Sequence, residues 1–302
     1  MLQLVEIFLN VLAPVFIILG LAYAITKPLG LNSQTLSRIA YYVLTPAFVF
    51  ALLSSARIDV ALALRMIGFI TAVYVGSTLI AFLFARLLKR SREMTSAWMM
   101  IASFGNVGNF GLPIAQFAEG NQALLPATVY FLANLVFAFV VCVTLANVRR
   151  DNLGQSVLRV LKTPGLIAVL PALLVNSLAL PVPTVFSRVA DLLASALVPA
   201  MLLALGVQFA NVGLPRVTPD MVIGAGIRLI SGPALAFALA GAFGLSGVER
   251  NVGILQASMP TAVLVSIIAL ESKLLPEYVT ATVLFSNLAS ILTLPVVLVF
   301  LA

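Results

Sequence analysis

The residues best suited to bind a ligand lie together in one apolar stretch, 104–113, which reads FGNVGNFGLP. Glycine costs about 1 kcal/mol and proline about 3 kcal/mol relative to alanine inside a helix, so this composition predicts a broken helix. The freed backbone groups and the asparagine amides would line a polar site, for which the candidate residues are Gly105, Asn106, Asn109 and Pro113. A second interpretation stays open, because glycines at 105, 108 and 111 would also form a packing groove for a neighbouring helix.

A second interrupted stretch falls at the matching place later in the chain. When the Ala-Ser pair at 102–103 is aligned with the Ala-Ser pair at 257–258, Gly105 falls on Pro260 and Asn106 falls on Thr261. Two interrupted spans at corresponding positions are the best sequence indication of a transporter's binding site. The starts of two half-helices would present free N–H groups, which favour a negatively charged ligand.

Three more polar residues inside apolar stretches complete the set of candidate substrate-binding residues. Asn134 and Asn287 occupy equivalent places, 153 residues apart (287 − 134 = 153), and would either contact the breaks or cap carbonyls freed by them. Arg228 is a charge inside an apolar stretch, which is costly in lipid and indicates a function. We expect it either to attract an anion or to have a structural or interfacial role, with Asp191 as its protein partner.

The residue types that catalysis needs are scarce. The chain has no histidine and a single cysteine, Cys142, which lies in an apolar stretch. The commonest general base and the soft metal ligands are therefore missing, and no nucleophile–base pair can be assembled. We expect no enzyme activity, no metal site and no cofactor. The coupling ion of a carrier, a proton or sodium, is left open.

The composition requires these candidates to be positioned by membrane helices. The chain has 302 residues, of which 62% are apolar and 9% are charged, whereas globular chains carry roughly 25% charged residues. Lipid cannot satisfy free backbone groups, so apolar runs of about 20 residues predict helices. Ten such spans are predicted, at 4–25, 36–55, 63–88, 96–118, 123–147, 163–180, 185–209, 219–243, 250–270 and 276–301. The two broken helices are the fourth and ninth spans.

The positive charges predict the orientation of these spans. Of the 17 Lys and Arg residues, 12 fall in odd-numbered connections and Arg228 lies inside the eighth span. The remaining four, in even-numbered connections, are Arg57, Arg65, Arg188 and Arg250. Cytoplasmic connections carry the excess of Lys and Arg, so both termini are expected on the non-cytoplasmic side.

The two halves of the chain resemble each other weakly. Residues 43–52 match 197–205, with Pro46 over Pro199, and the asparagines at 134 and 287 match at the same shift of 153. The units would be residues 1–150 and 151–302, each with five spans, so the second would be inverted in the membrane. The alternative is a helical bundle whose similarity is accidental.

With these features the sequence resembles the auxin efflux carrier family, which holds the plant PIN-FORMED carriers and bacterial relatives often described as malonate transporters. The resemblance covers essentially the whole chain and rests on Asn106-x-Gly108-x-x-Gly111-x-Pro113 together with residues 259–262, Met-Pro-Thr-Ala. It implies inverted repeats with crossing broken helices, as in the bile-acid sodium symporters. It also implies a scaffold domain, a transport domain that moves like an elevator, and an organic anion as the substrate. The short central connection, about 148–162, resembles bacterial members.

The sequence therefore predicts an all-α, polytopic secondary transporter of a small organic anion in the cell (inner) membrane. The expected partners are the organic anion and the lipid bilayer, with a homodimer as a candidate assembly and no nucleic acid. Two alternatives remain open. One is a sodium-coupled symporter of the bile-acid type, and the other is a sensor or channel that binds a ligand without carrying it.

Overall fold

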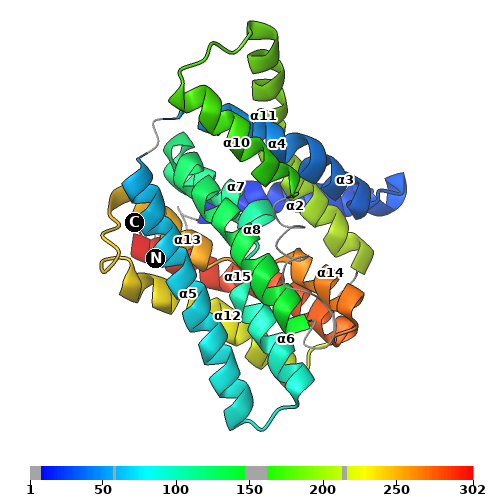
Figure 1. Cartoon of the computed structure of the whole chain (residues 1–302). Helices are drawn as coiled ribbons and strands as arrows, with labels where there is room; N and C mark the ends of the chain where they lie inside the picture. Colours follow the sequence, from blue (N-terminus) through cyan, green and yellow to red (C-terminus); the bar gives the residue numbers. More distant parts are fainter. Residues whose placement is uncertain (1–7, 57–58, 147–161, 213–215, 302) are drawn as a thin grey trace.

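The structure, a computed structural model, describes residues 8–56, 59–146, 162–212 and 216–301, and it is helical throughout (Figure 1). No β-strand occurs in these ranges, and their single β-type pairing is an isolated antiparallel bridge between Gly105 and Thr261. The predicted all-α architecture is confirmed for this part of the chain. Arg57 and the cations of the central connection before Lys162 lie outside the described residues.

The helical segments of the first half follow the five predicted spans. They are η1 (Phe8–Leu12), α2 (Ala13–Leu29), α3 (Ser33–Ile39), η2 (Ala40–Leu44), α4 (Thr45–Ser55), α5 (Val60–Leu87), α6 (Arg92–Ser103), η3 (Val107–Gly111), α7 (Leu112–Glu119), η4 (Asn121–Ala123) and α8 (Leu124–Ala146). Polar side chains begin several of them. The carboxylate of Asp59, for example, accepts hydrogen bonds from the N–H groups of Ala61 and Leu62, the second and third residues of α5.

The segments of the second half follow the other five spans, and the sixth is shorter than predicted. They are α10 (Pro164–Ser177), α11 (Thr184–Val212), α12 (Pro219–Leu239), α13 (Gly247–Ala257), α14 (Val263–Ser272) and α15 (Pro276–Leu301). Within the described residues, six helical segments meet both the length and the apolarity needed to cross a bilayer: Leu9–Leu29, Ser33–Ser55, Val60–Leu87, Thr184–Asn211, Pro219–Leu239 and Pro276–Leu301. Large apolar side chains cover their outer surface, as Leu192 and Leu292 show, so this is a multi-pass membrane protein.

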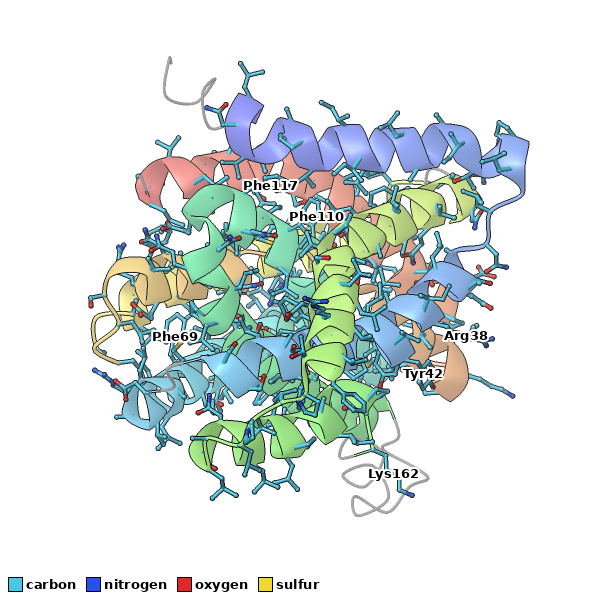
Figure 2. All side chains as sticks on the ribbon, turned by 90° about the horizontal axis from the view of Figure 1, so that it is seen from above. Arg38, Tyr42, Phe69, Phe110, Phe117 and Lys162 are labelled. Carbon is cyan, nitrogen blue, oxygen red and sulfur yellow. The ribbon has the colours of Figure 1, made fainter. Side chains whose placement is uncertain are left out.

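The helices form two packed groups. In one group α2 packs against α11, and α4 packs against α10 and α11; in the other α5, α6, α8 and α12–α15 pack together. Figure 1 shows α3, α4 and α10 in the upper part of the molecule and α5, α6 and α12 in the lower part. Seen from above, α2 and α11 lie side by side, and Arg38 and Lys162 are at the rim (Figure 2). The groups meet where η1 and α11 contact η3 and α7, and where α4 contacts α8.

Polar contacts between the ends of the spans fall into two sets. Even-numbered connections contact one another through Arg65 and Gly244 O (3.3 Å) and through Asn251 and Glu119 (2.9 Å). Odd-numbered connections do so through the ion pair Arg90–Asp220 (2.7 Å) and through Asn211 and Leu31 O (3.5 Å). Spans that cross the molecule in alternating directions would give this separation.

Candidate functional site

Two helices are interrupted where they meet inside the molecule. Helix α6 ends at Ser103 and η3 begins at Val107, while α13 ends at Ala257 and α14 begins at Val263. The intervening segments, 104–106 and 258–262, are called the crossover below. They run antiparallel and exchange two hydrogen bonds, Asn106 N to Pro260 O (2.7 Å) and Ala262 N to Phe104 O (2.8 Å). The predicted breaks in the fourth and ninth spans, and their meeting, are confirmed.

An asparagine from α15 binds both segments of the crossover. The Nδ2 of Asn106 donates to Asn287 Oδ1 (3.0 Å), and the Nδ2 of Asn287 donates to Thr261 O (2.9 Å). The N–H of Thr261 donates to Ser286 Oγ (3.1 Å), and its hydroxyl donates to Ile101 O (3.2 Å). All of these polar side chains are buried. Asn287 therefore both contacts the crossover and caps a freed carbonyl, the two roles predicted as alternatives.

Arg228 binds the ends of both interrupted helices. It lies on α12, is fully buried, and donates from Nη1 to Ala102 O (2.9 Å), from Nη2 to Ala257 O (3.2 Å) and from Nε to Met259 O (2.9 Å). The first carbonyl lies at the end of α6 and the other two at and beyond the end of α13. A helix C-terminus carries roughly half a negative charge, which a guanidinium neutralises. A structural role is thus evident, and the predicted contact with an anion stays a prediction.

The predicted partnership of Arg228 with Asp191 is wrong. Asp191 is exposed on α11, in the other group of helices, whereas every hydrogen bond of the buried guanidinium goes to a backbone carbonyl. The one ion pair among the described residues joins Arg90 to Asp220. Carbonyl dipoles, together with the ring of Tyr74 at 5.8 Å, offset the buried charge in place of a carboxylate.

The glycines of the fourth span serve both predicted purposes. A β-carbon on Gly105 would clash with Nη2 of Arg228, and one on Gly111 would clash with the side-chain oxygen of Gln256. One on Gly108 would lie 2.9 Å from the ring of Phe131. The broken helix and the small-residue groove are therefore the same feature, because close approach at the break requires residues without a side chain.

The starts of the two second half-helices are left uncapped. Neither η3, which begins after Asn106, nor α14, which begins after Ala262, has a side-chain cap. Since the first N–H groups of a helix have no intrahelical acceptor, those of Val107 and Gly108 and of Val263 and Leu264 lack one within the described residues. The crossover thus combines neutralised C-termini with unsatisfied N-termini.

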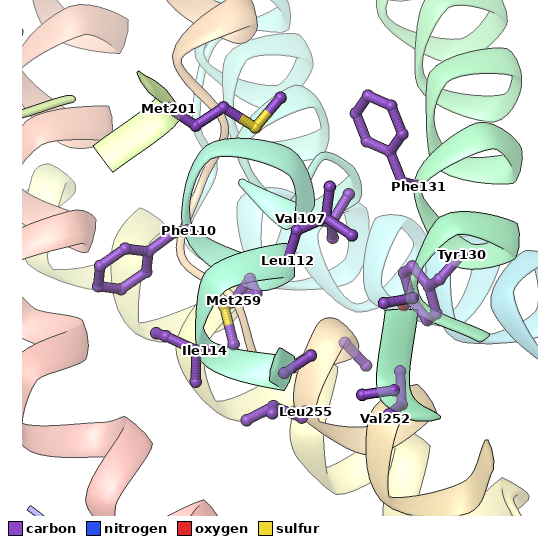
Figure 3. Packing of buried hydrophobic residues seen from close by; sticks show 14 of the residues in the cluster. Val107, Phe110, Leu112, Ile114, Tyr130, Phe131, Met201, Val252, Leu255 and Met259 are labelled. Carbon is purple, nitrogen blue, oxygen red and sulfur yellow. The ribbon is translucent and has the colours of Figure 1, made fainter. Parts of the chain in front are cut away.

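Apolar side chains cover the face of η3 that looks toward α11. Figure 3 shows Met201 and Phe131 beside the turn that carries Val107 and Phe110. The ring of Phe110 also lies edge-on to that of Phe16 on α2, with 6.2 Å between centroids. The crossover therefore adjoins the boundary between the two groups of helices, with apolar walls on one side and unsatisfied N–H groups behind them.

The remaining predicted residues lie near the crossover without bonding to it. Asn134 is buried on α8, and its Oδ1 accepts a hydrogen bond from the hydroxyl of Tyr74 (2.5 Å). Its amide nitrogen, like Oδ1 of Asn106, has no partner among the described residues. Asn109 is half-buried in η3, and Pro113 is buried in the first turn of α7. The structure brings the set together, and their contact with a substrate stays a prediction.

Sequence reasoning missed Gln256, Tyr74 and Tyr130. Gln256 lies in α13 and is fully buried. Within the described part of the chain, neither the nitrogen nor the oxygen of its amide has a hydrogen-bond partner, and the hydroxyl of Tyr130 has none either. Each is a polar residue inside an apolar span, the signal that identified Arg228. Buried polar groups without partners are rare in folded proteins, so those at the crossover are further candidates for ligand contact.

Comparisons with known proteins agree with a carrier. The sequence profile of the family described as "Membrane transport protein" matches residues 7–298. An "Uncharacterized transporter" of Methanothermobacter thermautotrophicus is 26% identical over 96% of this chain and 96% of its own length. An uncharacterised transporter of Methanocaldococcus jannaschii is 26% identical over 85% and 87%. A "Putative malonate transporter" of Rhizobium meliloti is 27% identical over 85% and 83%.

Gly105→Ala tests the close approach of Arg228 to the crossover. The added methyl group would overlap a guanidinium held by three hydrogen bonds, so we expect the free energy of unfolding to fall by about 1–3 kcal/mol. The matched control is Gly226→Ala on α12, where a β-carbon meets nothing within 4 Å. The melting temperature of each variant in detergent gives the answer. Equal melting temperatures for the two variants would contradict the assignment.

Proposed function

Because the chain belongs to the membrane transport protein family of the auxin efflux carriers, we propose that it is a secondary transporter of a small organic anion. The substrate would be a carboxylate, malonate-like or auxin-like, bound at the crossover in the cell membrane. The observation that carries this proposal is the pair of uncapped half-helix N-termini beside two C-termini already neutralised by Arg228. The name of the Rhizobium meliloti relative points to the same class of substrate.

The charges around the crossover favour an anion. Each helix N-terminus contributes roughly half a positive charge, and a carboxylate in a partly buried site gains up to about 2 kcal/mol from one such end. Acidic residues in the described part of the chain lie at the ends of helices, as Asp59 and Glu119 do, or on the exposed start of α11. No carboxylate there competes for the uncapped N–H groups.

The two groups of helices support an elevator mechanism. The group that contains α2, α4, α10 and α11 would be the scaffold, and the group that carries the crossover would be the transport domain. Their boundary at η3 is formed by apolar contacts such as Phe16 with Phe110, across which one group can slide. A site that adjoins this boundary would face each side of the membrane in turn.

The packing also supports two inverted halves of five spans each, 1–150 and 151–302. Helix α2 of the first half packs against α11 of the second, and α4 packs reciprocally against α10. The separation of even-numbered from odd-numbered connections supports ten alternating spans. With the excess of Lys and Arg in the odd-numbered set, both termini would lie on the non-cytoplasmic side.

Asn106→Asp tests the charge of the proposed substrate. Two like charges 4 Å apart repel by about 4 kcal/mol at an effective dielectric of 20, so anion transport should fall about a hundredfold or more. Asn106→Ala should lower it less, because only the amide is lost. Counterflow of radiolabelled malonate and other carboxylates in proteoliposomes measures both. The control is Asn121→Ala in η4, where an exposed asparagine bonds only Gln116. Wild-type rates in Asn106→Asp would overturn the site.

Gln256→Met tests whether the unpartnered amide acts in transport. Leaving a buried polar group unsatisfied costs about 1–3 kcal/mol, so its replacement by a thioether of similar length should leave the melting temperature unchanged or raise it. If the amide contacts the transported anion, counterflow should fall at the same time. Leu255→Met, at the neighbouring buried position, is the control. Full transport by Gln256→Met would limit its role to packing.

Cross-linking tests the elevator motion. Cysteines in place of Phe16 and Phe110, in a Cys142→Ala background, would join the two groups through a short bis-maleimide. A cross-link there should stop transport, since it holds the groups at one position. The matched pair replaces Phe237 and Phe300, whose rings are equally close (6.2 Å) but lie within one group. Transport that continues through the first cross-link would contradict the mechanism.

A further inference from the structure

The carbonyl groups at the ends of the interrupted helices converge on one side chain. Ala102 is the residue before the last of α6, Ala257 is the last residue of α13, and Met259 belongs to the crossover itself. All three accept hydrogen bonds from the guanidinium of Arg228, at 2.9, 3.2 and 2.9 Å. Two C-termini of about half a negative charge each thus meet one positive charge of the chain itself.

The same kind of oxygen set binds the coupling ion in carriers with discontinuous helices. In such carriers the carbonyls of unwound backbone and the C-terminal ends of half-helices coordinate Na⁺. A guanidinium already bonded to three of these oxygens leaves them unavailable to a metal ion, and its own charge repels one. The described residues also contain no cluster of three acidic, cysteine or histidine side chains that would hold a metal elsewhere.

The surrounding residues are built to hold this cation. Arg228 is fully buried, and Gly105 leaves the space that its Nη2 occupies. Gly232, one turn along α12, allows that helix to reach Ala257 O, because a β-carbon there would clash with the carbonyl. The ring of Tyr74 lies 5.8 Å from the guanidinium carbon and adds an attraction of the cation–π type. The surroundings of Arg228 therefore fit a planar guanidinium closely.

We propose that Arg228 is a resident cation that takes the place of Na⁺ at the crossover, so that this carrier works without sodium there. Two experiments test this proposal, one of thermal stability and one of transport. The transport experiment rests on the function proposed above, whereas the stability experiment does not. It separates this chain from sodium-coupled symporters of otherwise similar plan. It also predicts which ligand would bind in the space left by removing the Arg228 side chain. A variant without that side chain should bind a small monovalent cation there, and guanidinium most tightly.

The stability experiment uses the purified full-length protein. Arg228→Ala should lower the melting temperature by at least about 5 °C, and guanidinium chloride at tens of millimolar should restore at least half of that loss. Urea, which has a similar shape and no charge, should restore none, and the wild type should not respond to either. A variant as stable as the wild type, or one rescued equally by urea or by no cation, overturns the proposal.

A second pair of variants decides the question if Arg228→Ala does not fold. Arg228→Lys keeps the charge, whereas Arg228→Gln keeps hydrogen-bond donors without the charge. The proposal requires the lysine variant to melt higher than the glutamine variant. Equal melting temperatures, or a more stable glutamine variant, would show that hydrogen bonding alone is needed and would overturn it.

The transport experiment compares carboxylate uptake in proteoliposomes with Na⁺ or with choline. Wild-type rates should agree within twofold, and Arg228→Ala should lose transport in choline and regain part of it with Na⁺ or guanidinium. A tenfold fall of wild-type transport without Na⁺ overturns the inference. If no carboxylate is moved at all, the proposed function fails, and the melting experiments still decide the role of Arg228.

Discussion

Two helices that end inside a membrane protein leave backbone groups that must find partners, since each unsatisfied group in lipid costs several kcal/mol. The crossover meets this constraint in three ways. The two segments satisfy four of their own groups through a β-type bridge. Asn287 donates a hydrogen bond to the carbonyl of Thr261, and Arg228 donates hydrogen bonds to three carbonyls at the helix ends. The positions of α12 and α15 follow, because each must bring one polar side chain to the crossover.

What the chain does not satisfy is as informative as what it does. Every freed carbonyl described above has a strong donor, whereas the N–H groups at the starts of η3 and α14 have no cap. Free N–H groups suit a ligand site better than free carbonyl groups do here, because one anion can accept hydrogen bonds from several converging N–H groups at once. Under the proposed function, the C-terminal side of the crossover serves stability and the N-terminal side would serve binding. Its apolar neighbours Phe110, Phe131 and Met201 keep bulk water from that side.

Local composition predicted the breaks, and distant pairing could not be predicted. Glycine, asparagine and proline act on the helix that contains them, so the interruption of the fourth span follows from its composition. The interruption of the ninth span, which holds only Pro260, was predicted from its alignment with the fourth. The partners of Arg228 are 126, 29 and 31 positions away along the chain, and nothing in the sequence near residue 228 specifies them. Pairing of opposite charges suggested Asp191 as the partner. The partial negative charge of carbonyl groups at helix ends comes from the backbone, so the residue types do not reveal it. Gln256 was missed although it is a polar residue inside an apolar span, the same signal that identified Arg228.

The two halves of the proposed internal repeat differ at the position of Arg228, where the first half has Tyr74. Tyr74 lies 154 positions earlier (228 − 74 = 154), within one residue of the shift that relates Asn134 to Asn287, and the two side chains meet at 5.8 Å where α5 packs against α12. A second guanidinium there would add a charge for which no further helix end exists, because two C-termini supply only about one negative charge. The phenol instead donates a hydrogen bond to Oδ1 of Asn134. Both polar atoms of the Asn287 amide therefore bind groups of the protein itself. By contrast, the amide nitrogen of Asn134 and Oδ1 of Asn106 have no partner among the described residues. Under the proposed repeat, the two halves would share one architecture, and the difference between them would supply free polar atoms for a ligand.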